Sequence, residues 1–68
     1  MIIFSEVKMT EAGGKYRLEM SVNANGKKNR VRTPSSDDIF DADERRKFEV
    51  MAKDVLSFWA EKAQNAAT

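Results

Sequence analysis

Residues 16–33 read YRLEMSVNANGKKNRVRT and contain the clearest folding signal in the chain. Two segments of alternating character flank the pair Asn25-Gly26. An Asn-Gly pair in this setting predicts a two-residue type I′ turn, because both central positions of that turn need a positive φ. The turn fixes the register of a hairpin, which pairs Ala24 with Lys27, Met20 with Val31 and Glu19 with Arg32.

A second turn is predicted at Gly13-Gly14, with Ala12 opposite Lys15. The two turns together give a three-stranded antiparallel meander over residues 1–34, in which both registers agree on one apolar face. The side chains predicted on this face are Ile3, Val7, Met9, Tyr16, Leu18, Met20, Val22 and Val31. The opposite face then carries Lys8, Glu19 and Arg32 in a row, where opposite charges favour the register.

One long helix is predicted after the meander. Pro34 ends the third strand, residues 35–41 form a loop and helix cap, and Asp41 with Glu44 makes a capping-box pattern. The helix is expected over residues 42–66, packed on one face of the sheet, so that residues 1–68 form a single α+β domain of βββα order. Its apolar positions span about 160° of arc, wider than one small sheet needs. They are Phe48, Met51, Ala52, Val55, Leu56, Phe58, Trp59, Ala63 and Ala66.

Composition restricts the chemistry available to the domain. The 68 residues include no cysteine and no histidine, so neither a disulfide nor a thiolate or imidazole metal site is expected. A domain of this size must use its core fully or share it with a partner. Glu6 and Lys8 interrupt the apolar start long before the length of a membrane span, and we expect a cytoplasmic protein without membrane contact.

No pattern in the sequence predicts catalysis. The acidic group Asp37, Asp38, Asp41, Asp43 and Glu44 lacks the spacing of a calcium loop and is better explained by helix capping. No Ser or Thr stands beside an activating partner, and the glycine pairs lack the lysine of a phosphate loop. We therefore predict neither an enzyme nor a metal, cofactor or small-molecule site.

Basic residues are concentrated in the first half of the chain. Residues 1–36 contain seven Lys or Arg against three Glu. The predicted register gathers Lys8, Arg17, Lys28, Arg30 and Arg32 on the outer sheet face, together with Glu6 and Glu19. Two interpretations stay open: ordinary solvated ion pairs, or a nucleic-acid surface on which Arg17, Lys28, Arg30 and Arg32 contact phosphates or base edges.

The arrangement of a three-stranded sheet covered by a C-terminal helix resembles the arm-binding domains of some integrases and the plant AP2-type domain. The resemblance extends over residues 15–60 and rests on this topology, the turn Asn25-Gly26-Lys27-Lys28, and Arg30 and Arg32. It implies that the strands read DNA. The aromatic-rich strand of those families is absent from this sequence, and a shared fold does not by itself carry a function.

Surplus hydrophobic side chains give the leading functional hypothesis. Ile2 and Phe4 alternate out of phase with Ile3 and Val7, so they are predicted on the outer face of an edge strand. Together with the wide apolar arc of the helix, this predicts a non-catalytic interaction module, either a homodimer or the partner of a larger protein, of the kind found among bacterial and phage accessory proteins. The predicted interface anchors are Ile2, Phe4, Phe58 and Trp59. The alternative is that Ile2 and Phe4 fold over the rim of the sheet and that Phe58 and Trp59 fill the core.

Overall fold

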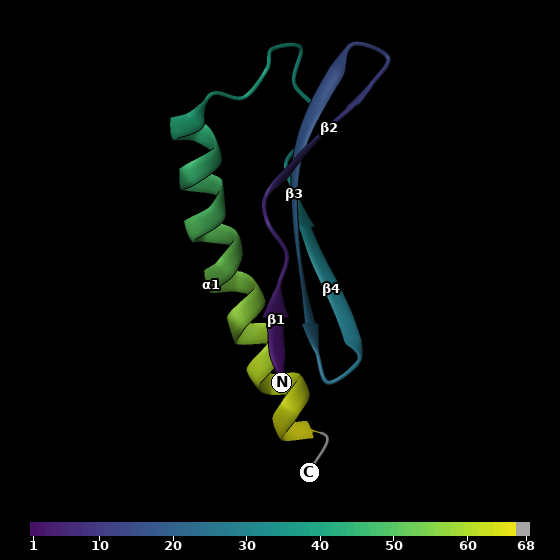
Figure 1. The fold of residues 1–68 in the computed structure, drawn as a ribbon, viewed down its shortest axis with the longest axis vertical. Coiled ribbons are helices and arrows are strands. Elements are labelled where there is room, and N and C mark those ends of the chain that lie inside the picture. The colour runs from purple at the N-terminus through teal and green to yellow at the C-terminus, as the bar shows by residue number, and fades with distance from the viewer. Residues whose placement is uncertain (67–68) are drawn as a thin grey trace.

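A computed structural model describes residues 1–66 of the chain, with the side chain of Ala66 outside the description. An antiparallel sheet forms one layer, and a single C-terminal helix lies along it as the second layer (Figure 1). The elements in chain order are β1 (Ile2–Phe4), β2 (Lys8–Ala12), β3 (Lys15–Ala24), β4 (Lys27–Arg32) and α1 (Ala42–Ala66). The predicted α+β class and C-terminal helix are confirmed, while the sheet has four strands instead of three.

The long strand β3 forms the centre of the sheet, with β4 on one side and both β1 and β2 on the other. Asn25 and Gly26 have φ values of 54° and 88°, as a type I′ turn requires. Gly13 and Gly14 also have positive φ, at 60° and 79°. Both predicted registers are confirmed, with Ala24 opposite Lys27, Glu19 opposite Arg32, Ala12 opposite Lys15 and Lys8 opposite Glu19.

A bulge divides the predicted first strand into β1 and β2. Phe4 pairs with Val22 and Lys8 pairs with Glu19, so three residues of the edge strand stand opposite two residues of β3. Ser5 holds the bulge in place: its amide donates to the carbonyl of Ser21 at 2.8 Å, and its Oγ accepts from the Ser21 amide at 2.9 Å. One extra residue reverses the alternation of side chains, and β1 therefore presents the opposite faces from those predicted.

The bulge overturns the predicted positions of Ile2 and Phe4. They pair with Ala24 and Val22, whose side chains are buried beneath the helix, and both pack half-buried against the core. Side chains directly opposite each other in an antiparallel pair lie on the same face. Ile3, which was predicted on the inner face, lies instead on the outer face and is 57% exposed.

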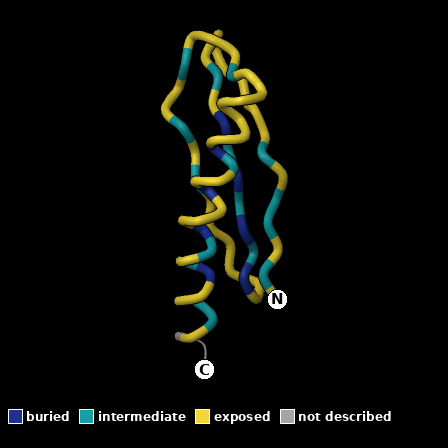
Figure 2. The backbone as a smooth tube through the Cα atoms, turned by 90° about the vertical axis from the view of Figure 1, so that its left-hand side faces the viewer, coloured by how far each residue is buried: buried dark blue, intermediate teal, exposed yellow. Residues whose placement is uncertain are grey.

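The core lies between β3 and α1 (Figure 2). Alternate residues of β3 meet every fourth residue of the helix, as the periods of a strand and a helix require. The buried side chains are Leu18, Met20, Val22 and Ala24 from the strand, and Phe48, Ala52, Leu56 and Ala60 from the helix. Val7 and Val31 pack against this core as predicted. Met9 remains 39% exposed, although its partner Leu18 is buried, because α1 packs over β3 and β4 and not over the edge strand β2. The tip of the β2–β3 hairpin extends beyond the first turn of α1 (Figure 1).

The loop between β4 and α1 is fixed at both ends. Tyr16 and Ser36 exchange backbone hydrogen bonds of 2.8 and 2.9 Å, which tie the loop to β3 beyond the end of β4. At the start of α1, Asp41 Oδ1 accepts from the Glu44 amide at 2.8 Å, and Glu44 Oε1 accepts from the Asp41 amide at 3.1 Å. These reciprocal bonds confirm the predicted capping box, which satisfies two donors that the first turn of a helix leaves unpaired.

Candidate functional site

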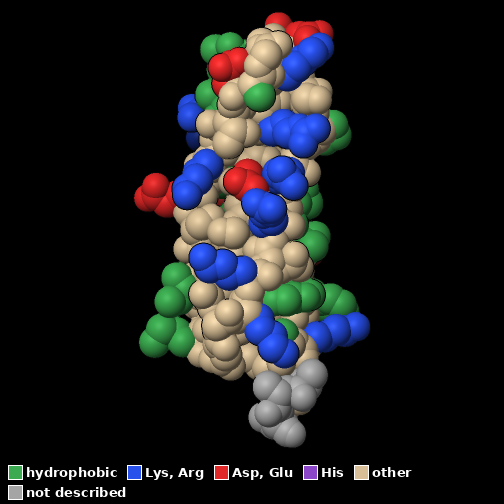
Figure 3. All heavy atoms as spheres, turned by 90° about the vertical axis from the view of Figure 1, so that its right-hand side faces the viewer, with side chains coloured by type: hydrophobic (Ala, Val, Ile, Leu, Met, Phe, Trp, Pro, Cys, Tyr) green, Lys and Arg blue, Asp and Glu red, His purple; other side chains and the backbone are tan. Residues whose placement is uncertain are grey.

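The outer face of the sheet is rich in cations. Alternate residues of β2, β3 and β4 point away from the helix, and six of them are Lys or Arg, whereas Glu19 is the acidic residue at these positions. We call this surface the basic face; its cations are Lys8, Lys15, Arg17, Lys28, Arg30 and Arg32. Lys and Arg side chains are spread along most of its length in Figure 3. The structure thus places all four predicted nucleic-acid contacts, Arg17, Lys28, Arg30 and Arg32, on one surface.

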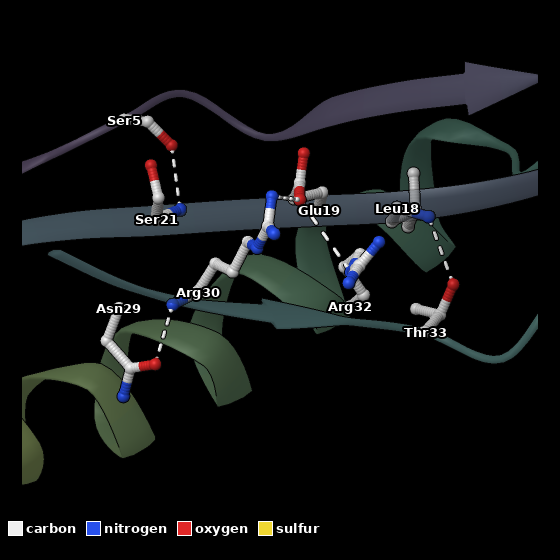
Figure 4. Close-up of polar contacts among 8 residues, drawn as sticks. All are labelled: Ser5, Leu18, Glu19, Ser21, Asn29, Arg30, Arg32 and Thr33. Carbon is white, nitrogen blue, oxygen red and sulfur yellow. Dashed lines mark hydrogen bonds and ion pairs between the residues drawn. The ribbon is translucent and has the colours of Figure 1, made fainter.

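Glu19 lies at the centre of the basic face, between two arginines (Figure 4). Its Oε1 is 3.4 Å from Arg30 Nη1 and 3.8 Å from Arg32 Nε. One carboxylate shared by two guanidinium groups leaves one positive charge uncompensated, and each guanidinium carries five N–H donors. Exposed pairs of this kind contribute about 0–1 kcal/mol, so both arginines can turn to another anion at little cost.

The other cations of the basic face have fewer acidic neighbours. Lys15 pairs with Asp37 from the loop after β4. Lys8, Arg17 and Lys28 form no ion pair with any residue in the described part of the chain, and Glu6 lies exposed in the bulge. Phe4 and Val7 both face the core, so Glu6 between them lies on the outer side as well. Glu6, Glu19 and Asp37 together offset three of the six cations, which leaves an excess of three positive charges on this face.

Two shallow hollows lie along the basic face. The first is lined by Glu19, Ser21, Lys28, Asn29 and Arg30. The second is lined by Thr10, Ala12, Lys15, Arg17, Arg32 and Ser35. Cations and hydroxyls line both hollows, and the first also has the amide of Asn29 and the carboxylate of Glu19. Cations, hydroxyls and amides are the side-chain types that most often bind phosphate oxygens.

The basic face offers no flat ring for stacking. The outward residues of β2, β3 and β4 include no aromatic side chain, and Tyr16 points to the helix side of the sheet. The large apolar residue on this side is Ile3 of β1, opposite Asn23. What the face presents is therefore charge and hydrogen-bond donors.

The four predicted interface anchors do not form one surface. Ile2, Phe4 and Trp59 pack half-buried against the core, and only Phe58 remains largely exposed, at 63%. Phe58 has two exposed apolar neighbours on α1 that were not named as anchors: Met51, which is 47% exposed, and Val55, which is 49% exposed. We call Met51, Val55 and Phe58 the α1 stripe. Their spacing of four and three residues was the signal in the sequence that they share one side of the helix.

Four of the five acidic residues around the start of α1 have partners for their side chains. Asp41 and Glu44 cap the helix, Asp43 lies 3.1 Å from Lys47, and Asp37 pairs with Lys15. Residues 1–66 contain no group of three or more acidic, cysteine or histidine side chains arranged to hold a metal ion. Within the same residues, no helix combines the length and the apolar character needed to cross a membrane.

Comparisons of the chain with protein-family models, with curated proteins and with solved structures find no match.

Proposed function

We propose that this domain is a non-catalytic cytoplasmic module that binds duplex nucleic acid through the basic face. The observation that carries the proposal is the excess of three positive charges on a surface that no other described element covers. The same surface contains Arg30 and Arg32, on which the resemblance to sheet-type DNA-binding domains also rests. The biological setting we propose is that of a bacterial or phage accessory protein.

Phosphate binding explains why these cations stand on alternate positions. Lys28, Arg30 and Arg32 follow one another at two-residue spacing on β4, and a strand rises about 3.4 Å per residue, so their Cα atoms stand about 6.8 Å apart. Arginine suits the task because its planar fork matches two phosphate oxygens at once. Release of the counterions condensed on the nucleic acid then supplies most of the affinity.

Duplex DNA fits this face better than a single strand or duplex RNA. Proteins that bind single strands stack bases on aromatic rings, and the outward positions of β2, β3 and β4 carry none. A B-form major groove is about 12 Å wide and admits two β-strands side by side. β4 lies at the edge of the sheet, so β4 and its neighbour β3, which carry Lys28, Arg30, Arg32 and Arg17, can enter the groove first. The major groove of an RNA duplex is too narrow and deep for side chains to read.

Self-association is the leading hypothesis from the sequence, and fewer exposed side chains support it now that Ile2 and Phe4 pack against the core. The edge strand β1 therefore no longer offers the two hydrophobic anchors that were predicted there. Phe58 is still exposed, as part of the α1 stripe. We keep protein binding as the second candidate function, located on the helix and separate from the basic face.

Fluorescence anisotropy with a labelled random duplex of about 20 base pairs tests the proposal. If the basic face neutralises four phosphates, the slope of log K against log salt is about −3.6, and affinity falls roughly 150-fold between about 50 and 200 mM salt. A single strand of the same length is expected to bind more weakly. Absence of binding at the lowest salt, or binding that does not change with salt, would overturn the proposal.

Matched double variants locate the binding surface. Arg30→Gln with Arg32→Gln removes two cations from β4, and Arg45→Gln with Arg46→Gln removes two exposed cations from α1. The β4 variant is expected to lower the salt slope by about 1.8 and the low-salt affinity by roughly 10-fold or more per lost contact. The helix variant has the same net charge and is expected to bind within about twofold of the original chain. Equal losses in the two variants would show that net charge, and not the basic face, drives binding.

A further inference from the structure

We infer that the α1 stripe binds the same stripe of a second copy of this chain, with the two helices antiparallel. Met51, Val55 and Phe58 are each about half exposed or more although the helix has already formed its contacts with the sheet. They lie on α1, whereas the basic face lies on the far side of the sheet. This inference therefore does not depend on nucleic-acid binding.

The stripe is separate from the side of α1 that covers the sheet. At about 100° per residue, the centre of the stripe lies roughly 110° around the helix from the buried row of Phe48, Ala52, Leu56 and Ala60. Repacking within the monomer would have to rotate the whole helix to cover the stripe, which would expose Leu56 and Ala60. A surface on another molecule can cover it without that cost.

Charges at the two ends of the stripe make it complementary to itself. Glu44 and Lys62 lie on the same side of the helix as the stripe, within about 60° of arc and about 27 Å apart along the axis. An antiparallel pair centred near Lys53 brings Glu44 of each chain to Lys62 of the other. A parallel pair brings Glu44 to Glu44 and Lys62 to Lys62, and like charges oppose it. The charge pattern thus selects a second copy of this chain, in one orientation.

The same antiparallel arrangement, centred near Lys53, also brings the apolar side chains together. Met51 of one helix then lies opposite Val55 of the other, and Phe58 of one helix lies between Lys47 and Met51 of the other. Lys62 Nζ already lies 4.5 Å from the centroid of the Phe58 ring, and Lys47 is paired with Asp43. In the dimer, the methylene chain of each lysine can extend the apolar area at one end of the contact while the ammonium group stays in water.

The size of the stripe predicts a weak, reversible dimer. A stable interface buries about 800 Å² on each partner, and a strip one helix side wide and about 27 Å long offers clearly less. We therefore expect a dissociation constant in the range of roughly 10 to 500 µM, as in transient complexes. Self-association should be visible only at high protein concentration.

Sedimentation equilibrium over about 10 µM to 1 mM protein measures this directly. The average mass is expected to rise from the monomer value of 7.7 kDa toward twice that value. Phe58→Lys is expected to keep the chain monomeric over the whole range. Val50→Lys is the matched control, because Val50 is 69% exposed on another side of α1, and it should leave the dimer unchanged. A chain that stays at monomer mass at the highest concentration, or equal losses in the two variants, would overturn the inference; the first result would leave the stripe to a different protein.

A charge exchange tests the antiparallel orientation. Glu44→Lys and Lys62→Glu are each expected to weaken self-association at least threefold, because each places like charges together. The double variant should restore it to within about twofold of the original chain, since both intermolecular pairs are re-formed with opposite sense. Glu44→Lys also disturbs the helix cap, but rescue by Lys62→Glu cannot come from the cap. A double variant that is weaker than either single variant would contradict the antiparallel arrangement.

Discussion

The two faces of β3 have different roles: the inner face forms the core with α1, and the outer face carries exposed charged side chains. Leu18, Met20 and Val22 are each 1% exposed and face the helix, while Arg17 and Glu19, which alternate with them, face outward beside the cations of β2 and β4. Since α1 covers only one side of the sheet, substitutions on the two faces should have different effects. Inner-face changes should alter the free energy of unfolding, and outer-face changes should alter binding.

The bulge at Ser5–Val7 is where this difference between the two faces can be tested most easily. It reverses the alternation of the edge strand, so that Phe4 lies on the stabilising face and Ile3 on the exposed one. Ile3 and Phe4 are neighbours in the sequence, but their side chains lie on opposite faces of the sheet. Substitutions at these two positions therefore compare the two faces directly.

Phe4→Ala is expected to produce the larger effect. Removal of a half-buried ring that packs on the core should lower the free energy of unfolding by about 1–3 kcal/mol, somewhat below the cost at a fully buried site. Ile3→Ala should change it by less than about 0.5 kcal/mol, as at an ordinary surface position. Urea denaturation followed by circular dichroism measures both. A larger loss for Ile3→Ala than for Phe4→Ala would mean that the edge strand continues into β1 without a bulge.

Glu19→Gln is expected to change stability less than Phe4→Ala does, and to change the affinity for duplex nucleic acid. The change removes the carboxylate that Arg30 and Arg32 share, so the free energy of unfolding should fall by less than about 1 kcal/mol. Affinity for a duplex should rise by roughly threefold to tenfold at low salt, because both arginines then face the phosphates without a competing anion. Anisotropy titrations at one salt concentration compare the two chains. Unchanged or weaker binding would indicate that the central arginines take no part in it.

Much of the fold follows from local signals in the sequence. Asn25-Gly26 and Gly13-Gly14 supply the positive φ values of the two turns, and Asp41 with Glu44 supplies the helix cap. Each of these signals acts over a few residues and has few alternatives. The register of β2, β3 and β4 was predictable for that reason.

The bulge was not predictable in the same way. Ile2, Ile3 and Phe4 are all apolar, so either alternation would place hydrophobic side chains on the inner face. No glycine or proline marks the change of register, which depends on hydrogen bonds between Ser5 and Ser21 that form only after the strands have met. Tertiary contacts, and not local preference, select the outcome here.

Of the two candidate surfaces, the basic face was predictable from local signals, whereas the α1 stripe depends on tertiary packing. Arg17, Lys28, Arg30 and Arg32 share a face because their register depends on the predictable turns. Phe58 and Trp59 are neighbours in an apolar arc wide enough to be placed over the sheet in more than one rotation. Packing of Trp59 against the core, and of Phe48 and Ala52 beneath it, decides that Phe58 points outward with Met51 and Val55.

Chemical-shift mapping by two-dimensional NMR, with a short random duplex added to the labelled chain, locates the nucleic-acid surface residue by residue. We expect the backbone amides of Arg17, Lys28, Arg30 and Arg32 to shift most, and the shifts to shrink as salt is raised. The amides of Met51, Val55 and Phe58 should stay in place at low protein concentration. Shifts centred on α1, or no shifts on β3 and β4 at low salt, would contradict the assignment of nucleic-acid binding to the basic face.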